Sequence, residues 1–224
     1  MNRVQRAVTV EKLFPPGAVA FETRSRGSAS DLLPTERECV ARSMDKRVSE
    51  FAAGRLCAHA AFAALGIEPT PLLMGMDRAP IWPAAVVGSI THSEGYCTAV
   101  AGCEAQFAAI GVDAECSKEM SASLWHLVMR EEELQRLQNL KEDAGERMAL
   151  LIFLAKEAFY KCQYELTRTW LGFEDVVIDV ADDAFEVSVV DASHPIRRMR
   201  GPWIGRFSVG EDVVVAGIAA KRCR

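Results

Sequence analysis

The sequence predicts an α+β fold made of two similar halves, each with a long helix and several antiparallel strands. Half of the 224 residues are apolar, which is enough for a core of ordinary size. Helical periodicity before residue 66 and again at 146–166 is followed each time by short apolar segments bounded by glycine and proline. No low-complexity linker separates the halves. We expect an N-terminal lobe at 1–105 and a C-terminal lobe at 106–224, in extensive contact.

The first half is expected to begin with a strand at 19–25. The sequence Thr35-Glu36-Arg37-Glu38 matches a capping box, with threonine at the cap and glutamate three residues later. It predicts an alanine-rich helix that runs to about Leu65 and stops at Gly66. Two strands at 85–93 and 95–102 should then form a hairpin.

The second half is expected to begin with a strand at 106–115, followed by helical segments over 117–165. These segments start at Ser121, at 129–138 and at 146–166, and the last is the longest and most apolar. Four strands should follow Gly172, at 175–181, 184–191, 203–210 and 212–220. Gly210-Glu211 predicts a tight turn between the last two.

Charge and cysteine content narrow the class of protein. The net charge of −5, from 26 Lys and Arg against 31 Asp and Glu, argues against a general nucleic-acid binder. The seven cysteines have no C-x-x-C spacing and lie mostly among apolar residues, so we expect reduced thiols rather than a zinc site or disulfides. No signal peptide and no apolar run of about 18 residues is found. We therefore expect a soluble cytoplasmic protein without a membrane span.

Asp113-Ala114-Glu115 ends the strand at 106–115. Residues i and i+2 of a strand face the same side, so the spacing predicts two neighbouring carboxylates. Such carboxylates repel each other unless a cation lies between them. Oxygen ligands favour Mg²⁺, with Mn²⁺ as the alternative. A polar strand end facing water is the competing interpretation.

Lys156, Glu157 and Lys161 lie in the most apolar helix, directly after ALLIFLA. Glu157 and Lys161 are four residues apart and share a face, whereas Lys156 lies about 100° round the helix from Glu157. Charges are uncommon in so apolar a helix without a partner or a function. A salt-bridged turn at the surface would also explain them.

Arg47 and Arg55 lie on the first long helix, within about 80° of each other. Between them, Ala52-Ala53-Gly54 have small side chains or none, so another group can approach the helix backbone closely. Two arginines beside a small-residue patch suit a phosphate-bearing ligand. Helix–helix packing, with the arginines in solvent, is the alternative. Arg78 lies in the loop 76–83, which two prolines stiffen.

The segment GSITHSEGY at 88–96 is unusually polar for the end of a core strand. Gly88 and Ser89 would leave room for a ligand, and Thr91 and His92 offer hydrogen bonds. A protonated histidine can donate to a phosphate from either ring nitrogen. A structural histidine at a strand end is the competing interpretation.

Five motifs in order, EFAAGRLCA, RAPIWP, VGSITHS, IGVDAE and FLAKEAFYK, resemble the 4′-phosphopantetheinyl transferase family. The similarity is to the monomeric, two-lobed type that serves siderophore, polyketide and nonribosomal peptide synthesis. It runs from Arg47 to Lys161, roughly half the chain. The resemblance implies two α/β lobes related by pseudo-twofold symmetry, each an antiparallel sheet packed with a long helix.

The resemblance also implies an activity, a cofactor and site residues. The activity is a magnesium-dependent transfer of phosphopantetheine from coenzyme A to a serine of an acidic apo carrier protein. The proton acceptor is either Glu157 or a metal-bound water. The implied metal ligands are Asp113, Glu115 and Glu157, and the implied lysines at the pyrophosphate are Lys156 and Lys161. The implied coenzyme A contacts are Arg47, Arg55, Arg78 beside the adenine, Thr91, and His92 at the 3′-phosphate.

Two other classes of function compete with this one. A metal-dependent nuclease also uses clustered acids, but its sites usually place E-x-K on a strand. Here Glu115 is followed by Cys116-Ser117, and the Lys/Glu group lies on a helix. A non-catalytic coenzyme A-binding module would have little use for three acids. The basic segment 197–206 is a candidate carrier-docking surface or a solvated loop.

Overall fold

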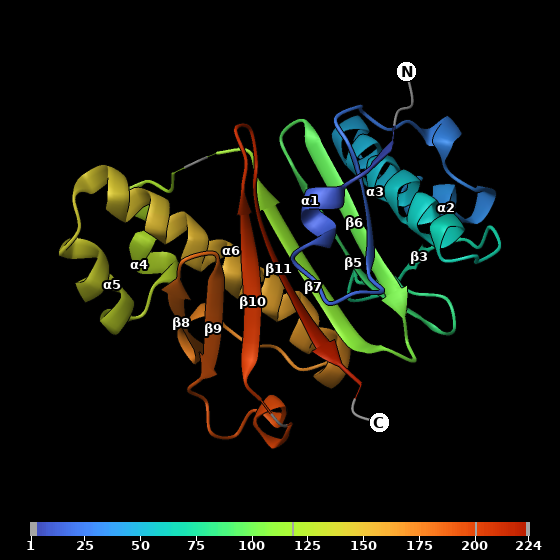
Figure 1. Ribbon diagram of the computed structural model, residues 1–224. Coiled ribbons are helices and arrows are strands. Elements are labelled where there is room, and N and C mark those ends of the chain that lie inside the picture. Colours follow the sequence, from blue (N-terminus) through green and yellow to red (C-terminus); the bar gives the residue numbers. More distant parts are fainter. Residues whose placement is uncertain (1–3, 118, 200, 223–224) are drawn as a thin grey trace.

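Two antiparallel sheets lie side by side in the computed structural model, which describes residues 4–117, 119–199 and 201–222 (Figure 1). The first sheet has the strand order β1-β2-β6-β5 and the second the order β7-β11-β10-β9-β8. The first sheet consists of β1 (Gln5–Arg6), β2 (Val19–Thr23), β5 (Val86–Ser93) and β6 (Tyr96–Cys103). The second consists of β7 (Phe107–Glu115), β8 (Val176–Ala181), β9 (Ala184–Val189), β10 (Trp203–Val209) and β11 (Val214–Lys221).

One long helix packs on each sheet. Helix α3 (Asp45–Ala64) contacts β2, β5 and β6, and helix α6 (Glu142–Thr167) contacts β7, β11 and β8. The prediction of an α+β fold with a sheet and a long helix in each lobe is confirmed. The shorter elements are α1 (Val8–Glu11), α2 (Pro34–Cys39), α4 (Trp125–Val128), α5 (Glu131–Gln138) and the small hairpin β3 (Leu73–Met74) with β4 (Pro80–Ile81).

A shared apolar core joins the two lobes. Phe14 of the segment after α1 and Val100 of β6 belong to the same buried cluster as Phe107 and Val112 of β7. Separate cores lie under α3, around Phe62, and under α6. Because apolar side chains from both sheets fill the space between them, the lobes fix each other's position.

The first helical region differs from the prediction of one helix over 35–65. It is divided into α2 and α3 by the turn at 40–44. Pro34 occupies the first helical position, and Glu36, not Glu38, caps α2 by accepting a hydrogen bond from Leu33 N at 3.0 Å. The capping-box prediction at Thr35 was therefore wrong by two positions, because Pro34 with its fixed φ begins the helix after the N-cap Leu33.

The other predicted elements occur in the predicted order, whereas β1, α1, β3 and β4 were not predicted. Helix α6 begins at Glu142, four residues before the predicted start, and the predicted turn at Gly210-Glu211 extends over residues 210–213. Helix α6 lies close to β7 at Gly111, where an added Cβ would meet the carbonyl oxygen of Ala158 at 1.9 Å. The close approach places the middle of α6, with Glu157 and Lys161, beside the end of β7.

Candidate active site

The end of β7 places Asp113 and Glu115 at the junction of the lobes. Asp113 Oδ1 accepts a hydrogen bond from Thr91 Oγ1 at 2.7 Å, and Glu115 Oε2 accepts one from Ser93 Oγ at 2.6 Å. Both hydroxyls come from β5, so the two acids face the same side of β7, as their i, i+2 spacing predicts. The structure therefore brings residues of both lobes together at this point.

Helix α6 adds Lys161 and Glu157 to these acids. Lys161 Nζ donates to Asp113 Oδ1 at 2.7 Å and to the carbonyl of Val112 at 3.1 Å. Burial raises the pKa of Glu157, and the nearby Asp113 carboxylate raises it further, whereas Lys161 acts in the opposite direction. Glu157 and Lys161 share the face of α6 that the i, i+4 spacing predicts.

The acids keep unused oxygens. Within 4–117, 119–199 and 201–222, no hydrogen bond or ion pair involves Asp113 Oδ2, Glu115 Oε1 or either carboxylate oxygen of Glu157. In this arrangement, no three His, Cys, Asp or Glu residues among those described are grouped closely enough to hold an ion. Free carboxylate oxygens on mutually repelling acids nevertheless have the chemistry that Mg²⁺ or Mn²⁺ prefers.

Arg47 and His92 lie on the N-lobe side of the acids. Burial lowers the pKa of His92; Glu50 opposes this effect, Arg47 and Lys161 lower the pKa further, and Asp113 raises it. His92 Nε2 is 3.8 Å from Glu50 Oε2. These mutual influences place His92, Arg47, Lys161 and Asp113 in one electrostatic neighbourhood, so the predicted phosphate contacts and the predicted metal acids adjoin each other.

Arg55 is not free to meet a ligand in this arrangement. It is 5% exposed, it stacks over Phe51 at 3.8 Å from the ring centroid, and its guanidinium donates to the carbonyls of Leu72 and Leu73. Burial lowers its pKa to about 10. Its contacts hold the loop before β3, and its predicted contact with coenzyme A remains a prediction.

The small residues near this site serve packing, which corrects the expectation that they leave room for a ligand. A Cβ at Gly54 would meet Ile90 Cγ2 at 3.0 Å, so the glycine lets α3 approach β5. A Cβ at Gly88 would lie 2.5 Å from the carbonyl oxygen of Val100. Ser89 is buried and accepts a hydrogen bond from Val112 N at 3.1 Å. Thr91 is also buried, with its hydroxyl bound to Asp113.

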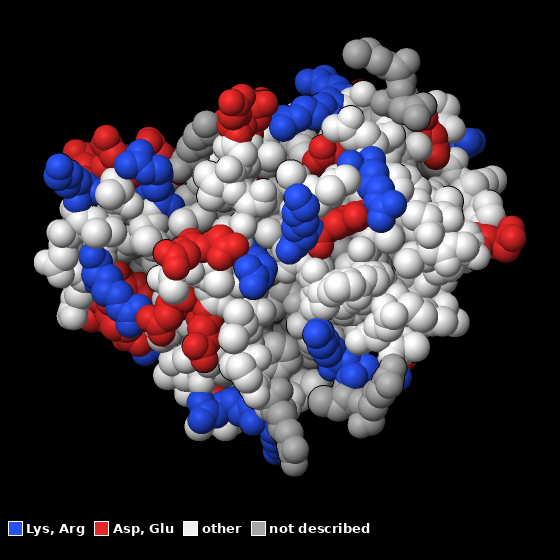
Figure 2. Space-filling view, viewed as in Figure 1, with Lys and Arg blue, Asp and Glu red and all other residues white. Residues whose placement is uncertain are grey.

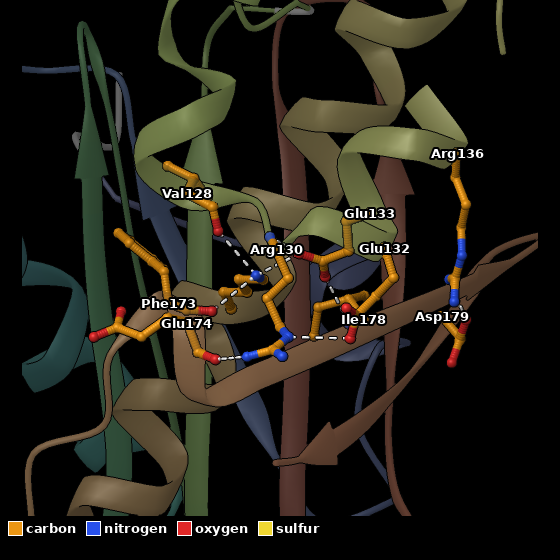
Figure 3. A network of polar contacts seen from close by, with 10 residues as sticks. Val128, Arg130, Glu132, Glu133, Arg136, Phe173, Glu174, Ile178 and Asp179 are labelled. Carbon is orange, nitrogen blue, oxygen red and sulfur yellow. Dashed lines mark hydrogen bonds and ion pairs between the residues drawn. The ribbon is translucent and has the colours of Figure 1, made fainter. Parts of the chain in front are cut away.

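The ammonium of Lys156 is buried in a network with Val128, Glu133 and Phe173, and Figure 3 shows these three partners. Its ammonium donates to Glu133 Oε2 at 2.6 Å, to the carbonyl of Val128 at 2.9 Å and to the carbonyl of Phe173 at 3.0 Å. An ammonium has three donors, and all of them are used here. The structure does not bring Lys156 together with Asp113, and its predicted contact with the pyrophosphate remains a prediction.

Two hollows border this region. One of about 200 Å³ is mostly apolar and includes Glu157 and Lys156 in its wall, together with Tyr160 and Trp170. The other, of about 810 Å³, lies between the loop 75–87 and the end of α6. No predicted acid or lysine lines the larger hollow.

The loop that carries Arg78 is tied across the lobes. Asp77 Oδ2 accepts a hydrogen bond from Tyr164 Oη at 3.0 Å and lies 3.8 Å from Arg168. Tyr164 lies in the last turn of α6, and Arg168 follows the helix directly. Arg78 itself is exposed and has φ of 67°. The structure thus leaves Arg78 on the surface of the loop, and its predicted contact with the adenine remains a prediction.

Sequence reasoning missed two kinds of residue. Glu133 lies in the run Glu131-Glu132-Glu133, which reads as a solvated face, yet its side chain is 0% exposed. Ser93 carried a usable signal, because Ser89, Thr91 and Ser93 alternate and must face one side of β5. Only the partner strand was unknown.

Comparison with known proteins decides the family. A family model described as the 4′-phosphopantetheinyl transferase N-terminal domain matches residues 35–102, and one described as the 4′-phosphopantetheinyl transferase superfamily matches residues 109–213. A relative from Streptomyces mobaraensis, 4′-phosphopantetheinyl transferase Svp, is 36% identical over 218 residues, which cover 94% of this chain and 88% of that protein. The chain belongs to the 4′-phosphopantetheinyl transferase family. It is therefore a transferase, and the family supports transfer of phosphopantetheine to carrier proteins.

Further relatives are similar over much of their length. PptT of Mycobacterium tuberculosis is 34% identical over 197 residues, which cover 83% of this chain and 85% of that protein. Enterobactin synthase component D of Escherichia coli strain K12 is 33% identical over 136 residues, covering 59% and 62%. The second family match begins at the third residue of β7, and it contains all three predicted metal acids.

The surface of this transferase carries both signs of charge. Figure 2 shows acidic and basic side chains interspersed on one face, without a broad basic surface. Within the candidate docking segment 197–206, Arg206 pairs with Asp183 at 3.1 Å and Arg197 donates to the carbonyl of Val189, while residue 200 lies outside the described residues. Among the described residues, no helix is both long and apolar enough to cross a bilayer.

Proposed function

We propose that this transferase moves the 4′-phosphopantetheine group from coenzyme A to a serine hydroxyl of an apo carrier protein and releases 3′,5′-ADP. The observation that carries the proposal is the meeting of three acids with unused oxygens and a cationic group at the junction of the lobes. The acids are Asp113, Glu115 and Glu157, the cations are Arg47 and Lys161, and the imidazole of His92 lies beside them.

The reaction exchanges one phosphorus–oxygen bond for another. The serine oxygen bonds to the phosphorus that carries the pantetheine, the bond from this phosphorus to the 3′,5′-ADP oxygen breaks, and the serine proton is taken up by Glu157 or by water. Negative charge grows on the departing ADP. Lys161 stands where it can neutralise that charge, because its ammonium already lies among the acids.

Mg²⁺ or Mn²⁺ would be held by Asp113, Glu115 and Glu157, and when bound it supplies positive charge to the pyrophosphate. After burial, the Asp113 carboxylate is the second cause of the raised pKa of Glu157, and a cation between the two acids would relieve this repulsion, which supports the assignment. Lys161 would then exchange part of its contact with Asp113 for the phosphate.

The phosphates, the adenine and the pantetheine arm of coenzyme A each have residues of suitable chemistry near the acids or on the loop 76–83. Arg47 and His92 suit the phosphates on the nucleotide side, with His92 at the 3′-phosphate, and Arg78 lies on the loop for the adenine. The long, mostly neutral pantetheine arm suits the apolar hollow that has Glu157 in its wall.

We further propose that the enzyme acts in the cytoplasm as a monomer, with lobes at 1–105 and 106–224. One chain supplies residues from both lobes to the site, which supports a monomer. The name of the enterobactin-synthase relative suggests carriers of siderophore synthesis as first substrates, with polyketide and nonribosomal peptide carriers next. Membership in a transferase family argues against the nuclease and the non-catalytic binding module.

The direct test is mass spectrometry of a purified apo carrier protein incubated with the enzyme, coenzyme A and Mg²⁺. We expect the carrier mass to rise by one phosphopantetheine group, and the rise to disappear with Glu157→Gln or with a chelator. Glu165→Gln, two turns further along α6, is the matched control. Unmodified acyl, aryl and peptidyl carriers throughout a panel would contradict the proposal, as would wild-type turnover by Glu157→Gln.

A further inference from the structure

The two sheets meet edge to edge without a backbone ladder. Strand β5 is the last strand of the first sheet and β7 the first strand of the second, and the two are neighbours. An edge strand exposes backbone donors and acceptors that must find partners. Here β5 meets β7 through its own side-chain hydroxyls at alternate positions, Ser89, Thr91 and Ser93, which all face β7.

Three hydroxyl contacts connect the strands in sequence. Ser89 Oγ accepts from Val112 N at 3.1 Å, and Thr91 Oγ1 donates to Asp113 Oδ1 at 2.7 Å. Ser93 Oγ donates to Glu115 Oε2 at 2.6 Å and accepts from Cys116 N at 3.1 Å. The first contact reaches only backbone, whereas the other two reach the carboxylates of the predicted metal acids.

These contacts give the two oxygens of each carboxylate different surroundings. A hydroxyl bond to an ionised carboxylate at 2.6–2.7 Å is charge-assisted and strong. It fixes which oxygen of Asp113 and of Glu115 faces β5. Among the described residues, the other oxygen of each acid has no hydrogen bond, so it remains available to a cation.

We propose that Thr91 and Ser93 are positioning residues for the metal acids: two N-lobe hydroxyls orient Asp113 and Glu115 of the C-lobe so that one oxygen of each faces the cation. The inference rests on the proposed function, in which these acids hold Mg²⁺. It gives Thr91 a role toward Asp113 in place of the predicted contact with coenzyme A, and it assigns a role to Ser93, which had none.

The test is direct binding of Mn²⁺, followed by electron paramagnetic resonance of the free ion, with coenzyme A present and no carrier protein. Removal of a group that orients a metal ligand typically costs about 10–100-fold in metal affinity. We expect that loss for Thr91→Val and for Ser93→Ala. Ser89→Ala is the matched control, because the Ser89 hydroxyl contacts the backbone of β7 and no carboxylate. We expect the Mn²⁺ affinity of this variant to equal that of the wild type.

Two further variants separate orientation from packing. Thr91→Ser and Ser93→Thr keep the hydroxyl, so we expect them to retain Mn²⁺ affinity even where urea unfolding shows lower stability. Ser93 is only half-buried, so Ser93→Ala can report on the inference if Thr91→Val does not fold. Mn²⁺ affinities of Thr91→Val and Ser93→Ala equal to that of Ser89→Ala would overturn the inference.

The inference and the proposed function can fail separately. Carrier modification by the wild type, with unchanged Mn²⁺ affinity in Thr91→Val and Ser93→Ala, removes the inference alone. Weakened Mn²⁺ binding in these variants, with no carrier modified by the wild type, supports the inference and removes the proposed function. A wild-type enzyme that binds no Mn²⁺ in the presence of coenzyme A overturns the inference.

Discussion

Lys156 and Glu133 form a buried ion pair. We expect its removal to lower the free energy of unfolding. Their side chains are 1% and 0% exposed and their charged atoms are 2.6 Å apart. Glu133 also accepts from Ile178 N and from Arg130 N, each at 2.9 Å (Figure 3). One carboxylate therefore joins α5, α6 and β8.

The expected loss in the free energy of unfolding depends on which buried groups each substitution leaves without a partner. Glu133→Leu leaves a buried ammonium without its counter-charge and two backbone donors without an acceptor, and breaking such a pair typically costs about 3–5 kcal/mol. Lys156→Met leaves Glu133 with two backbone donors, so we expect a loss near the lower end, about 3 kcal/mol. The double variant removes both charges, and we expect it to lose less than the sum of the single losses.

Urea unfolding of the three variants and the wild type without ligands measures these free energies. Domains of this kind have about 5–15 kcal/mol of stability in total, so the expected losses are readily measured. A loss below about 1 kcal/mol for Lys156→Met, the size expected of an exposed pair, would refute the reasoning. If that variant also lost carrier modification, Lys156 would be a phosphate contact, as the sequence alone predicts.

Three further changes test neighbouring parts of the site. Glu157→Gln should abolish transfer yet raise the melting temperature of the ligand-free protein at neutral pH, because the raised pKa of Glu157 shows that its charged form is disfavoured in the fold. For the same reason, the melting temperature of the wild type should rise as the pH falls through the raised pKa of Glu157, and that of Glu157→Gln should lack this rise. A melting temperature of Glu157→Gln below that of the wild type at neutral pH would contradict this reasoning. His92→Ala should weaken binding of coenzyme A, measured by calorimetry, with a milder loss for 3′-dephospho-coenzyme A, and an equal loss with both would remove the 3′-phosphate role. Gly111→Ala should cost at least about 1–3 kcal/mol in urea unfolding, because its methyl group would overlap the carbonyl of Ala158, and native stability would show that α6 can move away from β7.

The sequence by itself determined the α+β class, the order of the elements and the faces of the key side chains. The i, i+2 spacing put Asp113 and Glu115 on one side of a strand, and the i, i+4 spacing put Glu157 and Lys161 on one side of a helix. Such statements depend on local periodicity, which a short segment specifies without its neighbours. The five ordered motifs likewise led to the correct family.

Only the tertiary structure decided which partner each of these faces meets. Periodicity placed Lys156 about 100° from Glu157, but only the packing of α5 shows that Glu133 receives its ammonium. Arg55 meets the carbonyls of Leu72 and Leu73, and Thr91 and Ser93 meet the acids of β7. A buried charge or hydroxyl must be satisfied by whichever group the fold brings to it, and that group is usually distant in the sequence.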